Sequence, residues 1–135
     1  MAKYGRAFLI DVHGQSAIPG SIVRGTANGQ TVKALNEKFG RDAIAGPNSV
    51  LGFLEKSRNY TIVPPSADEA APEDKRYGGG HTVRTYGSGN GGKVDALQME
   101  FGSALRTKDR LDQTATDAAD AIAAFAKAYL PADKK

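Results

Sequence analysis

The chain has 135 residues, of which 40% are hydrophobic and 24% charged, a composition that indicates about one folded domain and excludes wholesale disorder. Its formal net charge of +3 comes from interspersed acidic and basic residues without a basic run, so we expect no nucleic acid partner. No stretch approaches the ~20 apolar residues of a membrane-spanning helix, and no signal peptide pattern opens the chain. We therefore expect a cytoplasmic protein without a membrane partner.

The first predicted element is a buried strand over Ala7–Val12, a short apolar run that ends at His13. Residues 14–29 are rich in Gly, Ser, Thr and Asn, which predicts a loop. Apolar residues at helical spacing then predict a helix over Thr31–Phe39, and Gly40 supplies its stop signal.

The middle of the chain predicts a short helix, a strand and an exposed connection. Asn48 or Ser49 can cap a helix that runs through Leu54. Tyr60–Val63 has the pattern of a strand and is closed by two prolines. Residues 66–75 are acidic and rich in Ala and Pro, which indicates a connection on the surface.

The last third of the chain predicts a glycine-rich loop, a strand and a long helix. Residues 78–92 are the most glycine-dense part of the sequence, and Val94–Phe101 alternates between two sets of side chains. Leu111–Tyr129 has apolar residues at helical spacing, and Pro131 is expected to end that helix. Strands separated by helices predict an α/β layered domain with a mixed sheet.

His13 is the first candidate functional residue, because it follows a buried strand at its carboxyl end. Open α/β sheets bind ligands at this position, and a neutral imidazole there can coordinate a metal or transfer a proton. Gly14 allows a sharp turn and a close approach of substrate to the backbone. The alternative is a buried histidine that only hydrogen-bonds a neighbour, and the local pattern leaves both interpretations open.

Gln98 and Glu100 form the second candidate group, since they lie two apart on an otherwise apolar strand and project from the same face. A carboxylate there is costly to bury unless it is paired, hydrogen-bonded or facing a cleft. The position therefore suits a general base. The alternative is an edge strand whose polar face meets solvent.

The glycine-dense segment matches neither the P-loop nor the dinucleotide-binding fingerprint at the required spacing. It is better interpreted as a flexible loop that places Arg84 over an anion, since a guanidinium binds a carboxylate in bidentate fashion. The alternative is a mobile surface hairpin. His81 is predicted to be a loop residue without a role in metal binding.

The order of five motifs resembles the bacterial N-formylglutamate amidohydrolases and their zinc carboxypeptidase-like relatives over residues 7–130. In chain order the motifs are LIDVHGQS, GTANGQTV, GPNSVLGFLE, YGGGHTVRTYGS and GGKVDALQMEFG. Their order and spacing are more specific than any one motif. The resemblance implies an α/β fold of the zinc carboxypeptidase-like (phosphorylase/hydrolase-like) type, a layered domain with a mixed sheet flanked by helices. It also implies that residues 1–135 form a single domain, the carboxy-terminal portion of a larger zinc hydrolase domain.

The resemblance further implies the roles of individual residues. In the family, zinc is held by a His and a Glu of an early H-x-x-E element and by a later His, which His13 matches. Glu100 matches the catalytic carboxylate that activates zinc-bound water and then protonates the departing amine. Arg84 matches a loop arginine suited to the carboxylate of the substrate, and Gln98 is a second residue that we expect to bind substrate.

The chain departs from this family because it contains no H-x-x-E element and only two histidines. A catalytic zinc ion usually takes three protein ligands. Two explanations stay open: a truncated portion of a longer enzyme, which we favour, or a natural short relative that is inactive alone or completed by another polypeptide. Loss of the early half exposes a sheet edge, so we expect self-association or pairing with the missing amino-terminal segment.

We therefore expect zinc-dependent hydrolysis of an amide bond in an N-acyl amino acid such as N-formylglutamate, performed by the complete enzyme. The alternative is a non-catalytic binding module that retains the fold and the anion-binding loop without a metal. The zinc content of the protein with its upstream segment separates the two functions.

Overall fold

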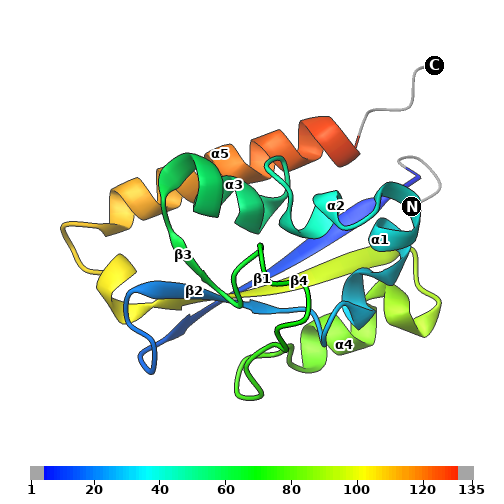
Figure 1. The fold of residues 1–135 in the computed structure, drawn as a ribbon, viewed down its shortest axis with the longest axis horizontal. Coiled ribbons are helices and arrows are strands. Elements are labelled where there is room, and N and C mark those ends of the chain that lie inside the picture. Colours follow the sequence, from blue (N-terminus) through cyan, green and yellow to red (C-terminus); the bar gives the residue numbers. More distant parts are fainter. Residues whose placement is uncertain (1–4, 131–135) are drawn as a thin grey trace.

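The computed structural model describes residues 5–130 as an α/β domain, a four-stranded mixed sheet flanked by helices (Figure 1). In space the strands follow the order β1-β4-β2-β3. Their bounds are Ala7–Gln15 for β1, Ser21–Gly25 for β2, Thr61–Val63 for β3 and Val94–Gly102 for β4. β1 pairs with β4 and β2 with β3 in parallel, whereas β2 and β4 are antiparallel. In the described residues β4 and β2 are therefore internal strands, and β1 and β3 form the edges.

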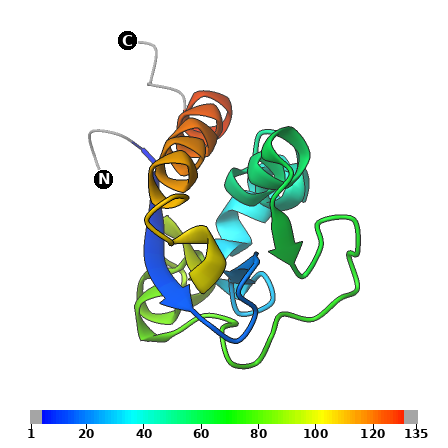
Figure 2. The ribbon, with the colours of Figure 1, turned by 90° about the vertical axis from the view of Figure 1, so that its left-hand side faces the viewer.

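Two layers of helices cover the sheet. Helices α3 and α5 pack side by side over one face, and α4 lies on the other (Figures 1 and 2). The helices are α1 (Lys33–Phe39), α2 (Asp42–Ala45), α3 (Val50–Arg58), α4 (His81–Tyr86) and α5 (Leu111–Tyr129). Short 3-10 turns occupy Gln30–Val32, Ser88–Asn90 and Ser103–Leu105. Within residues 5–130, every helix is too short or too polar to cross a lipid bilayer.

The hydrophobic core lies between the sheet and the α3–α5 layer. Leu97, Met99 and Phe101 occupy alternate positions of β4 and pack in one cluster with Phe125 of α5. Phe125 is 2% exposed and stacks on Phe8 of β1, with ring centroids 4.3 Å apart. Burial of these large side chains is the main force that holds α5 on the sheet.

Most of the elements expected from the sequence are confirmed. β1, β3, β4, α1, α3 and α5 all form where the patterns predict them. Ser49 is the residue that caps α3, since its side chain accepts a hydrogen bond from the backbone nitrogen of Gly52. The predicted stop of α5, Pro131, lies outside the described residues, and the helix ends at Tyr129.

Two expectations about loops are wrong, and a third is confirmed with one addition. Residues 14–29 contain β2, which is buried throughout because it lies between β4 and β3. Residues 78–92, expected to form a flexible loop, contain α4, and His81 is its first residue. Residues 66–75 form the expected connection without helix or strand and are mostly exposed, although the side chains of Ser66 and Glu73 are buried.

Candidate functional site

His13 and Glu100 are register partners on the parallel strands β1 and β4, and Asp11 and Gln98 are the preceding partners on the same face. Partnered residues of neighbouring strands project from one face of a sheet, and the strands are about 4.8 Å apart. β1 runs on to Gln15, so His13 lies within the strand and not after its end as the sequence predicts. The structure thus brings three of the four predicted site residues onto one face.

Glu100 is a buried carboxylate with a fixed hydrogen-bond donor. It is 6% exposed, and its Oε1 accepts a hydrogen bond of 2.9 Å from Nε2 of Gln98. On the antiparallel side its register partner is Val23, an apolar residue with no exposed surface. The expectation of an edge strand with a solvated polar face is wrong, because β4 is internal and buried on both faces. Glu100 thus has the apolar Val23 on one side and polar residues of β1 and β4 around it on the same face, an environment that suits a carboxylate that exchanges protons.

The backbone before α4 fixes the orientation of the Gln98 amide. The backbone nitrogen of Gly80 donates to Oε1 of Gln98 at 2.7 Å, which turns Nε2 toward Glu100. This approach requires a glycine at position 25, the register partner of Gln98. A Cβ at Gly25 would overlap the carbonyl oxygen of Tyr77 and lie 2.8 Å from the backbone nitrogen of Gly79.

Asp11 is a site residue that the sequence reasoning missed. Its Oδ1 lies 3.0 Å from Nε2 of His13, and the two side chains are 21% and 48% exposed. A carboxylate on one ring nitrogen orients an imidazole and leaves Nδ1 for a ligand, as is common where histidines bind metals. The signal was present, because an Asp-x-His sequence on a strand puts both side chains on one face.

Arg84 lies apart from these residues. It belongs to α4, where its Nε donates to the carbonyl oxygen of Gly79 at 2.7 Å. It lines a cavity of about 360 Å³ whose walls include neither His13 nor Glu100. Its position on a short helix is better defined than the flexible loop that the glycine content predicts.

The described residues do not form a zinc site by themselves. No group of three or more His, Cys, Asp or Glu side chains in residues 5–130 is arranged to hold a metal ion. His13 fits as one ligand, since its imidazole is oriented by Asp11 and accessible, but a catalytic zinc usually takes three protein ligands. The remaining ligands would have to come from other polypeptide. In comparisons with known proteins, the chain matches no family model, no curated protein and no solved structure.

Proposed function

We propose that this chain supplies the proton-transferring carboxylate, Glu100, and one metal-ligating imidazole, His13, to a zinc-dependent amidohydrolase of the zinc carboxypeptidase-like fold. Its substrate would be an N-acyl amino acid such as N-formylglutamate, and the other metal ligands would come from polypeptide outside this sequence. The observation that supports the proposal is the register pairing of His13 with Glu100 on neighbouring parallel strands. A side-by-side imidazole and buried carboxylate are the groups that metal-assisted hydrolysis requires.

Glu100 acts in this proposal as general base and then as general acid. Its carboxylate takes a proton from the attacking water, and it returns that proton to the amine nitrogen as the C–N bond breaks. Gln98 holds Oε1 of Glu100 through its own hydrogen bond of 2.9 Å, so the carboxylate is positioned before substrate arrives. Zinc, when bound in the complete site, lowers the pKa of a water molecule.

Arg84 anchors the carboxylate of the substrate in the same proposal. Its Nε is occupied by the carbonyl oxygen of Gly79, which leaves the outer nitrogens of the guanidinium for an anion. Arg84 donates to the carbonyl oxygen of Gly79, and the next residue, Gly80, donates to Oε1 of Gln98. Gln98 therefore links the anchoring region to the carboxylate of Glu100.

The test uses the longest native reading frame that contains this chain, purified and assayed with N-formyl-L-glutamate. Glu100→Gln keeps the shape of the side chain, so we expect the zinc content to stay unchanged while turnover falls by about 10² to 10⁴-fold. Glu37→Gln, a change of the same type at an exposed position, is the matched control and should retain full turnover. Unchanged turnover in Glu100→Gln would end the assignment.

The alternative function is a binding module without a metal. It rests on Arg84, whose outer guanidinium nitrogens can bind an anion without a metal. Elemental analysis of the same native product separates the two functions. One zinc ion per chain, lost in His13→Ala, supports the hydrolase, whereas a metal-free protein that binds the substrate without turnover supports the binding module.

A further inference from the structure

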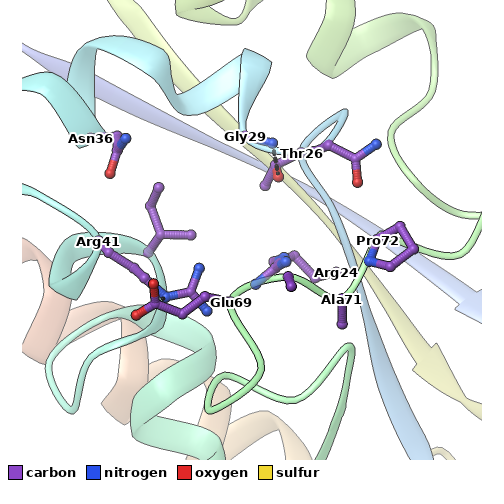
Figure 3. Close-up of a pocket in the computed structure, with 11 residues that line it drawn as sticks. Arg24, Thr26, Gly29, Asn36, Arg41, Glu69, Ala71 and Pro72 are labelled. Atoms are coloured by element: carbon purple, nitrogen blue, oxygen red, sulfur yellow. Dashed lines mark hydrogen bonds and ion pairs between the residues drawn. The ribbon is translucent and has the colours of Figure 1, made fainter.

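A second cavity lies between β2, α1, α2 and residues 69–72 (Figure 3). Its volume is about 400 Å³, which is in the range of cavities that bind small molecules. The polar groups in its wall include two guanidiniums, from Arg24 and Arg41, and two amides, from Asn28 and Asn36. Figure 3 shows the side chains of Arg24 and Arg41 extending toward each other from opposite walls.

Arg24 is buried and rigidly held, but only part of its hydrogen-bonding capacity is used. Its side chain is 10% exposed, and its Nε donates to Oε2 of Glu73 at 2.9 Å. Among the described residues, neither outer nitrogen of this guanidinium has a hydrogen-bond acceptor. Arg24 is also a wall residue of the cavity, so these donors are available to a ligand there.

Glu73 neutralises Arg24 only in part, because its carboxylate is shared with other donors. The backbone nitrogens of Thr26 and Asn28 donate to Oε1 at 2.8 and 2.7 Å, and the hydroxyl of Thr26 donates to Oε2 at 2.6 Å. The carboxylate thus fixes the position of Arg24 and has little capacity left for its outer nitrogens. An unpaired donor of a buried cation is a strong attraction for an anion.

Arg41 lies opposite Arg24, and its ion pair with Glu69 is weak. Its Nη2 donates to the carbonyl oxygen of Ser66 at 2.8 Å, and its Nε lies 3.3 Å from Oε1 of Glu69. The side chain of Glu69 is 76% exposed, and ion pairs of that kind contribute little to stability. The Glu69 carboxylate can therefore leave Arg41 at small cost.

We infer that this cavity binds a small organic anion whose carboxylate or phosphate group lies between Arg24 and Arg41. The planar forks of two guanidiniums match the oxygens of either group, and the side-chain amides of Asn28 and Asn36 offer further donors. Glu69 is the internal competitor that the ligand displaces from Arg41. Arg24 pairs in register with Met99, so the cavity is on the face of the sheet opposite Glu100, and the inference does not depend on the proposed hydrolase.

The test is isothermal titration of the protein with succinate and, separately, with inorganic phosphate, at an ionic strength held constant with sodium chloride. We expect saturable binding of at least one probe, and the tighter of the two identifies the ligand as a carboxylate or a phosphate. Arg41→Gln should weaken binding about tenfold or more, because it removes a charged donor. Glu69→Gln should tighten binding, since it removes the competing carboxylate.

Asp74→Asn is the matched control, because it removes one negative charge from the same connection between β3 and α4 but outside the cavity wall, where Asp74 pairs with Arg76. It should leave both affinities unchanged. The inference is overturned if neither probe binds saturably or if Arg41→Gln binds as the unchanged protein does. It is also overturned if Asp74→Asn and Glu69→Gln alter affinity equally, which would indicate an effect of overall charge. Far-ultraviolet circular dichroism of each variant confirms that it is folded.

Discussion

Glu73 accepts three hydrogen bonds from Thr26, two of 2.8 and 3.0 Å from its backbone nitrogen and one of 2.6 Å from its hydroxyl. The side chain of Glu73 is 1% exposed. One carboxylate from the connection between β3 and α4 thus replaces the strand partners that the chain loses where β2 ends at Gly25. The irregular segment after β2 has a defined shape because its backbone donors are satisfied in this way.

Replacing Glu73 should therefore destabilise the fold. Glu73→Ala leaves Arg24 buried without its partner, and breaking a buried pair in this way costs about 3 to 5 kcal/mol. The free energy of unfolding in urea, followed by circular dichroism, measures the loss. Glu69→Gln on the same segment is the control, and its exposed ion pair predicts a change below about 1 kcal/mol. An unfolding midpoint of Glu73→Ala equal to that of the unchanged protein would contradict the structural role.

Tyr60 predicts a loss of stability at high pH. Burial is the main cause that raises its pKa above the ordinary value of 10.0; Thr114 opposes this rise, and Asp117, which accepts its hydroxyl proton at 2.8 Å, adds to it. Well below pH 10 the tyrosine is protonated in both states, and its contribution to stability is fully present. Above that pH the unfolded chain loses its proton first, so stability falls as the pH rises through the folded-state pKa.

Tyr60→Phe should flatten this alkaline decline while lowering stability at pH 8, because Asp117 loses a donor. Free energies of unfolding at intervals from pH 8 to about pH 11 test both effects, since tyrosines ionise in that range. The exposed Tyr86→Phe is the control and should leave the whole curve in place. A decline in Tyr60→Phe as steep as in the unchanged protein would show that Tyr60 is not its source.

The elements of the fold could be predicted where the spacing of apolar residues follows the side that is buried. The alternation in residues 94–101 and the helical spacing in residues 111–129 correspond to β4 and α5. β2 was missed because Ser21–Gly25 follows a glycine, ends in a glycine and contains Arg24, which the local pattern cannot show to be buried. Its burial depends on Glu73, a partner forty-nine residues away in the sequence.

The candidate site could also be predicted only where the spacing of residues along a strand determines which face they share. Gln98 and Glu100 share a face because of their spacing on a strand, and their neighbour His13 follows from the parallel pairing of β1 with β4. The placement of Arg84 depends on tertiary structure, because the glycine content of its segment gives no indication of α4. The hydrogen bond from Gly80 to Gln98 could not be predicted from the sequence, because its donor is a backbone nitrogen, which almost every residue has.

The outer edge of β1 predicts concentration-dependent self-association. In the described residues no strand pairs with that edge, and Val12 is 66% exposed beside a groove that Leu111 and Ile122 also line. Val12→Lys should reduce the association, because a charge on an edge strand opposes pairing with another chain. Sedimentation velocity over a range of protein concentrations measures the effect.

Tyr86→Lys is the matched control for this prediction, since Tyr86 is a comparably exposed aromatic residue on α4, away from the groove. It should associate as strongly as the unchanged protein. A monomer at every concentration before any substitution would show that the β1 edge does not recruit a second copy.

Stability measurements can also separate a functional from a structural role of Glu100. The buried carboxylate of Glu100 accepts a hydrogen bond from Gln98 and has no ion-pair partner among the described residues, so its charge contributes little to folding. Glu100→Gln should therefore leave the free energy of unfolding unchanged or slightly higher. Gln98→Leu should lower it by about 1 to 3 kcal/mol, because the carboxylate then stays buried without a donor. Urea unfolding of both variants is the measurement. A large fall in the free energy of unfolding of Glu100→Gln would mean that the fold itself needs the charge. An unchanged free energy of unfolding would support a role of the charge in chemistry at the sheet face that Glu100 shares with His13.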